Sequence, residues 1–182
     1  MGITYKEYKH NPPHLFVPNC KYFITGATYK KKRWFKSDKA KERLLKSIKI
    51  GFDQHGWLLE DWVILDNHYH LMGNASEINN SLPKMIQDIH KFVAMWIRKN
   101  VHESISAEKI MYNYWDTCIT YEASYFARLN YIWNNPVKHG YTKSAEEWGF
   151  GSFIKRVEKD NEELEKIKAN YPWDKVRVKD DF

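Results

Sequence analysis

Apolar and polar residues alternate with two different periods along the first third of the chain, one typical of a strand and one typical of a helix. The run KYFITGATY at Lys21–Tyr29 is β-branched and aromatic, which predicts a first strand. Ser37 is positioned to cap a helix that runs to about His55, and Gly56 is expected to end it. Apolar residues recur at helical spacing along this helix, at Leu44, Leu45, Ile48 and Phe52. The segment therefore predicts a strand followed by an amphipathic helix.

The next apolar segment, WLLEDWVILDNHYHLMGNA at 57–75, predicts two short strands or one long bent strand. Asp66 and Asn67 are the expected break, because Asp and Asn favour turns. Ser81 opens a second predicted helix to about Asn100. Its apolar stripe consists of Leu82, Met85, Ile86, Ile89, Val93, Trp96 and Ile97. Basic residues recur at seven-residue spacing on another face, which fits either a solvated surface or contacts with backbone phosphates. These residues are Lys84, Lys91 and Arg98.

The second half of the chain predicts one more strand and two more helices. Tyr114–Thr120 has strand character. The segment SYFARLNYIWNN predicts a third helix, capped at Ser124 and ended by Pro136 and Gly140. The charged stretch 156–170 predicts an exposed helix, and an aromatic and basic tail follows it. Strands separated by helices, without a glycine-rich phosphate loop, predict an α+β fold of one sheet and a few helices.

Length and composition narrow the class of protein. The 182 residues, of which 43% are hydrophobic, suffice for one packed domain with or without a terminal extension. The chain has no apolar run long enough to cross a membrane, and its N-terminus lacks the plan of a signal peptide. The two cysteines show no CxxC spacing, which argues against a disulfide framework and a cysteine zinc site. The sequence therefore predicts a cytoplasmic protein without a membrane partner.

Charge and aromatic content add one functional indication. The formal net charge is +6, and aromatic residues make up 16% of the chain. Single-stranded nucleic acid is bound by cations that meet its phosphates and by flat rings that stack on its unpaired bases. The composition fits such a ligand, and it fits a solubilising lysine-rich surface equally well. Both interpretations stay open at this point.

The motif DNHYHLMG at 66–73 carries the most chemistry. On a strand, alternate side chains share a face, so His68 and His70 project the same way and Tyr69 projects the opposite way. Two neutral imidazoles on one face can chelate a divalent cation, but two ligands alone make a weak site. A third ligand must then come from elsewhere in the chain. Without one, the pair is two half-exposed strand residues.

Tyr131 and Asn135 are candidates to complete such a site. They stand four residues apart, so they lie about one turn apart on the same face of the predicted third helix. A phenol beside an amide ligand would give a nucleophile, a metal and room for a phosphodiester. Pro136 disfavours helical geometry at Asn135, whose side chain could instead cap the helix end. Tyr131 could equally be a core residue, because its neighbours are Leu129, Ile132 and Trp133.

These motifs together resemble a known family. DNHYHLM, followed about sixty residues later by LNYIWNNPVKHGY, resembles the single-tyrosine HUH transposases, and more closely the REP-associated tyrosine transposases of bacterial chromosomes. The blocks HNPPHLF, KYFITGATY, YWDTCIT and EWGFGSF also resemble that branch, so the likeness runs from about His10 to Phe153. The order of HxH, the aspartate-bearing YWD and a tyrosine followed by NPVKHG is highly specific.

The resemblance implies a fold and a domain plan. The implied fold is a ferredoxin-like antiparallel β-sheet with helices packed on it. The histidines would lie on a central strand and Tyr131 on a helix beside it. The transposase domain would cover residues 1–155, and a charged C-terminal helix and tail would cover residues 156–182. The role of that last segment is open, as is the choice between a monomer and a homodimer.

The resemblance also implies roles for single residues. His68 and His70 match the histidines that hold Mg²⁺ or Mn²⁺, Tyr131 matches the catalytic tyrosine, and Asn135 occupies the position of a third, amide ligand. Two imidazoles and one amide suit a weak, exchangeable Mg²⁺ or Mn²⁺ site completed by water, whereas Zn²⁺ would lack its usual third strong ligand. Tyr69 departs from the aliphatic residue usual between the histidines, although strand alternation turns it away from the metal.

The implied reaction is the cutting and joining of single-stranded DNA beside a hairpin repeat. A tyrosine with an ordinary pKa of about 10 is almost wholly neutral at pH 7, so a divalent ion that polarises a non-bridging phosphate oxygen would assist it. Attack would release a 3′-hydroxyl and leave a 5′-phosphotyrosine, which a second 3′-hydroxyl could reverse. The candidate DNA contacts are Lys30, Lys31, Lys32, Arg33, Trp34, Lys138 and His139. Each of the cations among them could equally be an ordinary solvated side chain.

Two rival functions remain open on the sequence. The first is a domesticated protein that binds hairpin DNA without cutting it, against which the intact His68, His70 and Tyr131 argue. The second is a metal phosphodiesterase that uses water, with Tyr131 as a structural residue. A covalent protein–DNA adduct that depends on Tyr131 would exclude both.

Overall fold

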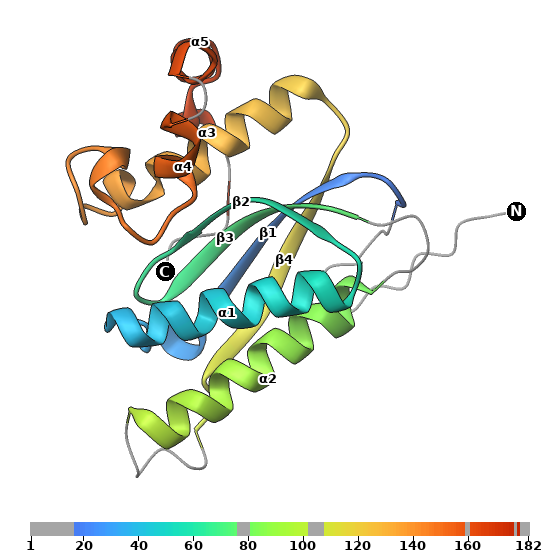
Figure 1. Ribbon diagram of the computed structural model, residues 1–182, viewed down its shortest axis with the longest axis vertical. Helices are drawn as coiled ribbons and strands as arrows, with labels where there is room; N and C mark the ends of the chain where they lie inside the picture. The colour runs from blue at the N-terminus through green and yellow to red at the C-terminus, as the bar shows by residue number, and fades with distance from the viewer. Residues whose placement is uncertain (1–16, 76–80, 102–107, 159–160, 177, 179–182) are drawn as a thin grey trace, which may run out of the picture.

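A four-stranded antiparallel sheet with the strand order β2-β3-β1-β4 lies at the centre of the protein (Figure 1). The computed structural model describes residues 17–75, 81–101, 108–158, 161–176 and 178. The strands are β1 (Lys21–Thr28), β2 (Leu58–Ile64), β3 (His68–Asn74) and β4 (Met111–Ile119). The element order β1, α1, β2, β3, α2, β4, with β1 and β3 in the middle of the sheet, confirms the predicted ferredoxin-like α+β fold.

Helices α1 (Asp38–Gln54) and α2 (Leu82–Asn100) cover one face of the sheet (Figure 1). Ser37 begins α1 as predicted, because its hydroxyl accepts a hydrogen bond from the N–H of Ala40 at 3.3 Å. Gly56 follows the end of this helix with a φ of 69°, a conformation that glycine adopts without strain. The predicted bounds of both helices and the break between β2 and β3 are confirmed.

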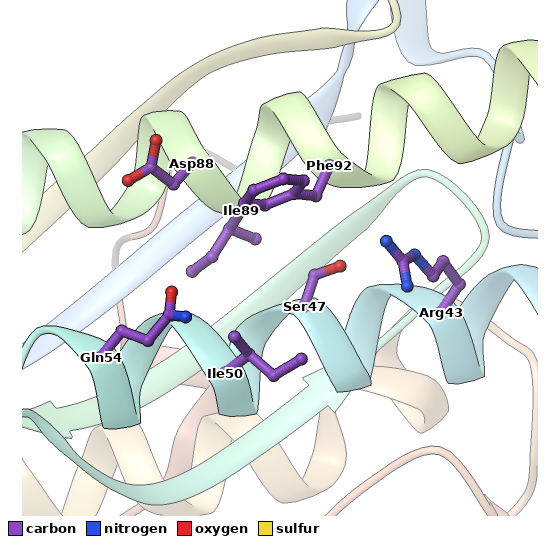
Figure 2. A pocket seen from close by; sticks show the side chains of 8 residues that line it. Arg43, Ser47, Ile50, Gln54, Asp88, Ile89 and Phe92 are labelled. Carbon is purple, nitrogen blue, oxygen red and sulfur yellow. The ribbon is translucent and has the colours of Figure 1, made fainter.

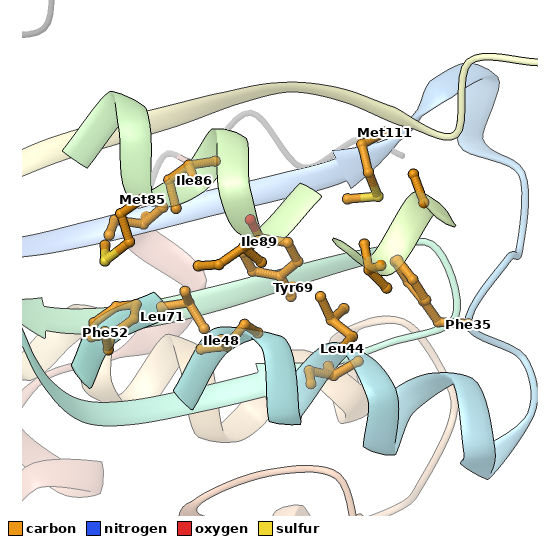
Figure 3. Packing of buried hydrophobic residues seen from close by; sticks show 14 of the residues in the cluster. Phe35, Leu44, Ile48, Phe52, Tyr69, Leu71, Met85, Ile86, Ile89 and Met111 are labelled. Atoms are coloured by element: carbon orange, nitrogen blue, oxygen red, sulfur yellow. The ribbon is translucent and has the colours of Figure 1, made fainter. Parts of the chain in front are cut away.

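Apolar side chains from these two helices pack on alternate strand residues to form the first core cluster (Figure 3). Its strand members are Tyr22, Ile24, Ile64, Tyr69, Leu71 and Met111. The predicted stripe of α2 lies in this core, with Trp96 partly buried at its edge. Gly26 lies opposite Tyr69 in the sheet, and a Cβ on it would stand only 2.2 Å from the Tyr69 ring. The tyrosine ring therefore occupies space that only a glycine leaves open.

The opposite face of the sheet carries α3 (Glu122–Lys138) together with α4 (Phe153–Val157) and α5 (Asn161–Asn170) (Figure 1). A second core cluster fills this side, and its strand members are Phe23, Val63, Met72 and Ile119. Short 3₁₀ turns occur at η1 (Tyr29–Lys31), η3 (Ala145–Glu147) and η4 (Trp173–Lys175). The predicted strand at Tyr114–Thr120 is confirmed as β4 and begins three residues earlier.

The ends of α3 correct two sequence predictions. The helix begins at Glu122, so Ser124 does not cap it. Pro136 does not end the helix either, and lies inside it. The turn continues past the proline, because the N–H of His139 still bonds to the carbonyl of Asn135 at 3.1 Å. Gly140, with a φ of 71°, follows the last turn as predicted.

The charged C-terminal stretch forms the end of α4 and the helix α5, and the prediction of an exposed helix is confirmed only for the outer face of α5. Arg156 lies in α4 and pairs with the carboxylate of Asp61, which is fully buried under it. Leu164 and Ile167 of α5 are 3% and 4% exposed and join the second core cluster. Two apolar residues three positions apart thus anchor one side of a helix whose charge content predicted exposure to solvent. The division of the chain at residues 155 and 156 stays a prediction.

Part of the family resemblance, from His10 to Phe16, lies outside the described residues. Residues 177 and 179–182 of the aromatic and basic tail lie outside them as well. Among the helices that the structure describes, none combines the length and apolarity needed to cross a membrane.

Candidate active site

Strand β3 presents the two histidines of the HxH motif on the α3 side of the sheet. The rings of His68 and His70 lie 5.2 Å apart between centroids, and both side chains are buried. Tyr69 points the other way, into the first core cluster, as strand alternation predicts. The alternative of two half-exposed strand residues is therefore wrong. The histidines form a buried polar pair in an otherwise apolar layer.

A polar neighbour fixes the orientation of each imidazole. The Nδ1 atom of His70 lies 2.9 Å from the hydroxyl of Thr25, its direct register partner on β1. The Nδ1 atom of His68 lies 2.7 Å from the side-chain oxygen of Asn67, the residue just before it. Metal-binding histidines commonly hold their second ring nitrogen in this way, which fixes the tautomer and the ring plane. In both rings, Nε2 is then the nitrogen that would bind a metal.

Helix α3 brings the other two predicted residues to this pair. The ring of Tyr131 stands edge-on to that of His70, with 5.3 Å between centroids and 78° between planes. One turn later, the side-chain oxygen of Asn135 lies 3.2 Å from Nε2 of His68. Asn135 is helical, and its side chain contacts the histidine instead of capping the helix end. Tyr131 is only 1% exposed, so it is a core residue as well as a neighbour of the site.

Burial keeps both histidines neutral. Burial, assisted by the charges of the nearby His139 and Lys138 and opposed by the contact with Asn135, lowers the pKa of His68 to about 3. Burial also lowers the pKa of His70 well below 6.5, with the neighbouring His68 as the next cause. Neutral imidazoles are the form that binds metal. A neutral His68 that donates from Nδ1 to Asn67 directs the Nε2 lone pair at the oxygen of Asn135.

That donor set fits a hard divalent ion. Two ligands that each lie about 2.1 Å from one octahedral ion are separated by about 3 Å, close to the 3.2 Å between His68 and Asn135. Within the described residues, no group of three His, Cys, Asp or Glu side chains is arranged to hold a metal ion. Among the described residues, the amide of Asn135 is in position to be a third ligand beside the two imidazoles.

The end of α3 adds positive charge and a third imidazole. The ammonium of Lys138 donates a hydrogen bond to the hydroxyl of Tyr131 at 2.9 Å and lies 4.8 Å from the centre of its ring. The ring of His139 stands 4.8 Å from that of His68. A cation bonded to a phenol favours its ionised form over its neutral form. The hydroxyl of Tyr131 is thus beside a group that stabilises a phenolate.

An open hollow of about 390 Å³ adjoins His68. It is lined by Lys31, Arg33, Asn67, His68, His139, Gly140 and Tyr141. Three of the predicted DNA contacts (Lys31, Arg33 and His139) therefore share one cavity with a predicted metal ligand. The cavity has the size of ordinary small-ligand sites, and its lining is mostly polar and basic. Such a lining suits a phosphate-bearing ligand.

The remaining predicted DNA contacts do not line this hollow. Lys30 lies 5.6 Å from the ring of Tyr29, and Lys32 lies 5.2 Å from the ring of Trp34 and pairs with Glu108. Trp34 itself packs partly buried against the first core cluster. The roles of all the predicted DNA contacts stay predictions.

A second concavity lies elsewhere, between α1 and α2 (Figure 2). Its volume is about 180 Å³, and it is lined by Arg43, Ser47, Ile50, Gly51, Gln54, Asp88, Ile89 and Phe92. These helices cover the face of the sheet opposite to the histidines. The groove is therefore separate from the candidate active site.

Sequence reasoning missed three residues of the site. Asn67 stood in the quoted motif but was assigned only to a turn, although its position next to His68 was a usable signal. Thr25 could not be found without the register that pairs it with His70. Tyr141 lines the hollow, and its hydroxyl accepts a hydrogen bond from Arg33 at 3.4 Å. It is the last residue of the quoted block LNYIWNNPVKHGY, where it was given no role.

Comparisons with known proteins agree with this fold. The model of a family described as IS200-like transposases matches residues 16–135. The REP-associated tyrosine transposase of Escherichia coli K12 is 28% identical over 97 residues, which are 53% of this chain and 54% of that protein. The chain thus matches about half the length of this curated relative. A solved structure of a REP-associated tyrosine transposase bound to a REP hairpin superposes with a TM-score of 0.69. It shares 20% identity, and the match covers 98% of this chain and 95% of that one, which establishes the common fold.

Proposed function

This chain belongs to the family of IS200-like transposases, and from that premise we propose that it cuts and rejoins single-stranded DNA through a covalent bond to Tyr131. The substrate would be a DNA hairpin with a single-stranded flank. A solved relative of the same fold is bound to a REP hairpin, which supports this class of partner. An enzyme that acts on chromosomal DNA of this kind would work in the cytoplasm.

One observation carries the proposal. A single helix, α3, sets Tyr131 against His70 and, one turn later, Asn135 against His68. A nucleophile and a candidate metal ligand are thus held on one rigid element beside the two histidines. Positioning of this kind is what an in-line attack on phosphorus requires. The ammonium of Lys138 on its hydroxyl distinguishes Tyr131 from the buried Tyr69, whose hydroxyl is bonded to a histidine.

The proposed cutting step uses the hydroxyl of Tyr131. The hydroxyl loses its proton to water and its oxygen attacks the phosphorus, the bond from phosphorus to the 3′-oxygen breaks, and the released 3′-oxygen takes up a proton from water. Lys138 stabilises the phenolate as the hydroxyl proton leaves. The new bond is a 5′-phosphotyrosine ester. Attack by a second 3′-hydroxyl on this ester reverses the step and joins two strands.

His68, His70 and Asn135 would hold the Mg²⁺ or Mn²⁺ ion. When bound, such an ion neutralises charge that develops on the non-bridging phosphate oxygens. Asn67 and Thr25 hold the imidazoles in the orientation that this role needs, from the opposite ring nitrogens. Because the buried histidines are neutral around pH 7, the lone pair on Nε2 of each ring would be available to the ion.

The hollow beside His68 is the proposed place of the nucleotide next to the cut. Lys31 and Arg33 would face its phosphate from the turn after β1, and His139 from the end of α3. The hydroxyl of Tyr131 lies under neighbouring atoms, since the residue is 1% exposed. The scissile phosphate can therefore reach it only after groups that cover the phenol have moved.

A covalent-adduct assay tests the proposal. The protein is mixed with Mn²⁺ and a labelled DNA hairpin that carries a single-stranded flank, and a denaturing gel detects label that travels with the protein. The native chain is expected to form the adduct. Tyr131→Phe is expected to form none while its affinity for the hairpin is unchanged, because only the hydroxyl is removed. Tyr69→Phe, which changes a tyrosine on the opposite face, is the matched control and should still form the adduct.

Each other result selects a rival function. Cleavage that survives Tyr131→Phe would favour a metal phosphodiesterase that uses water. Hairpin binding by the native chain without adduct or cleavage would favour a DNA-binding protein that has lost its activity. Sedimentation of the protein with and without the hairpin would decide between a monomer and a homodimer.

A further inference from the structure

The histidine face of the sheet continues onto the edge strand β4. His70 on β3 pairs in register with Thr25 on β1, and Thr25 pairs with Trp115 on β4. Residues directly opposite each other in antiparallel strands project from the same face. Trp115 therefore lies on the side of the candidate metal site, two strand spacings, or about 10 Å, from His70.

A bulge in β4 turns a second ring to the same side. The register steps from Gly26 opposite Tyr114 to Thr28 opposite Met111, so β4 carries one residue more than β1 between these pairs. Met111 and Tyr114 both pack toward the first core cluster although they are three residues apart. Tyr112, between them, is instead directed at Trp115, with 5.7 Å between ring centroids and 35° between planes. Bulges commonly re-aim a side chain in this way.

A third ring extends the row. Tyr29, at the start of η1, stacks on Tyr112 with 6.1 Å between centroids and 25° between planes. Tyr29, Tyr112 and Trp115 thus form a continuous aromatic strip along one end of the sheet. Tyr112 is 40% exposed, so the middle of the strip is open to solvent.

Two lysines lie over the strip. The ammonium of Lys109 is 5.3 Å from the ring of Tyr29 and 5.2 Å from that of Tyr112, and Lys30 lies 5.6 Å from Tyr29. Contacts of this kind between exposed cations and rings are weak. The lysines can therefore leave the rings for a phosphate at little cost. Flat rings in a row with flexible cations beside them are the combination that binds unpaired nucleotides.

We propose that the aromatic strip binds the unpaired nucleotides that flank the cut phosphodiester. The proposal rests on the proposed function and adds to it the path of the DNA strand. This path runs from the histidines across β1 to the edge of the sheet at β4. Bases stack on Tyr112 and Trp115, and their phosphates meet Lys109 and Lys30. A DNA duplex has no base faces to offer these rings, so the strip selects the single-stranded part of the substrate.

Charge and continuity favour this ligand over a protein. The strip lies on the same face as His70, and Lys30 joins it to the basic turn whose next residues line the hollow beside His68. A protein partner would be expected to meet an apolar patch, whereas each described cation here lies over a ring face. Stacking tolerates any base, because every base has a flat face. The strip should therefore hold the flank without reading its sequence.

Binding of a labelled oligothymidylate, measured by fluorescence anisotropy at low salt, tests the proposal. Tyr112→Ala is expected to weaken binding about 5- to 150-fold, the loss that corresponds to one stacked base. Tyr112→Phe keeps the ring and should bind like the native protein. Tyr121→Ala removes a 76% exposed tyrosine outside the strip and is the matched control, with no expected change. Thermal melting of each variant shows that it is folded.

The outcomes separate this proposal from the proposed function. Native-like binding by Tyr112→Ala and by Trp115→Ala would overturn the role of the strip, even if the native protein forms the covalent adduct. Adduct formation by a native protein that does not bind oligothymidylate would overturn it as well. Weaker binding by Tyr112→Ala, restored in Tyr112→Phe, supports it. Failure of the native protein both to bind oligothymidylate and to form an adduct would overturn the two proposals together.

Discussion

Tyr69 and Tyr131 are both buried tyrosines, at 0% and 1% exposure, and they lie on opposite faces of the same sheet. On the α1–α2 face, the hydroxyl of Tyr69 bonds to Nε2 of His90 at 2.8 Å, and burial raises the pKa of Tyr69 far above 10. On the α3 face, the hydroxyl of Tyr131 bonds to the ammonium of Lys138 at 2.9 Å. Burial alone therefore does not separate a structural tyrosine from a candidate nucleophile. The charge of the partner does.

The histidines of the two faces differ in the same way. His90 is buried on α2 beside Tyr69, with 6.0 Å between the ring centroids. His68 has a polar group at each ring nitrogen, Asn67 on one side and Asn135 on the other. One face thus uses a neutral histidine to satisfy a single phenol, while the other sets two of them among ligand-type groups. This contrast predicts that equivalent substitutions on the two faces will have opposite consequences for activity and stability.

The largest effect is expected from loss of a histidine on the α3 face. His68→Ala or His70→Ala should reduce Mn²⁺-dependent adduct formation about a thousandfold or more, because the charge stabilisation of the phosphate is lost. The double variant Tyr69→Phe/His90→Leu removes a hydrogen-bonded pair from the other face and should leave the rate unchanged. Single-turnover rates of adduct formation measure both. Equal losses in the two variants would erase the functional contrast between the faces.

A smaller effect is expected from the residue that orients His68. Asn67→Ala removes the partner of Nδ1 and should weaken Mn²⁺ binding about 10- to 100-fold. Because the chemistry is otherwise intact, the rate at saturating Mn²⁺ should fall much less than in His68→Ala. A Mn²⁺ titration of the adduct rate separates the two quantities. Asn100→Ala, an exposed amide at the end of α2, serves as the control. An unchanged Mn²⁺ dependence in Asn67→Ala would count against the metal site at His68.

The α1–α2 face should respond through stability instead. Gly26→Ala places a methyl group where ring atoms of Tyr69 lie 2.2–2.5 Å away, and overpacking of this kind costs about 1–3 kcal/mol. Urea unfolding should show this loss, while the adduct rate of the folded protein remains close to native. Gly149→Ala, which meets no atom within 4 Å, is the matched control. If Gly26→Ala instead abolishes the adduct without a loss of stability, the two faces are not independent.

The sequence predicted which face of the sheet each key residue occupies better than it predicted the contacts on that face. The period of two along HYH was enough to separate Tyr69 from the histidines, because strand alternation is fixed by the backbone. The spacing of four between Tyr131 and Asn135 likewise put both on one side of α3. In each case the geometry follows from a single element. Patterns of this local kind need no knowledge of the partner segments.

Features that depend on two elements escaped prediction. The contact of Thr25 with His70 depends on the register between β1 and β3, which nothing in either strand states alone. Pro136 was expected to end α3, but packing of the helix on the sheet outweighs its local preference. The charge of the C-terminal segment predicted a solvent-exposed helix, although Leu164 and Ile167 on its inner side are buried. Tertiary contacts decided each of these features.

A test in acid isolates the histidine of the α1–α2 face, His90, through the dependence of stability on pH. Burial lowers the pKa of His90 from 6.5 to about 4, so between these values the unfolded chain takes up a proton that the folded chain does not. The stability linked to neutral His90 is complete above pH 6.5 and is lost as the pH falls toward 4, by about 1.4 kcal/mol per pH unit. In Tyr69→Phe/His90→Leu, the free energy of unfolding should fall less steeply with falling pH, by that amount. The remaining pH dependence comes from the other buried histidines, His68 and His70, and from the remaining groups. Urea unfolding at a series of pH values from about 4.5 to 7 measures the slope, and an identical slope in the double variant would mean that His90 titrates in the folded protein as it does in the unfolded chain.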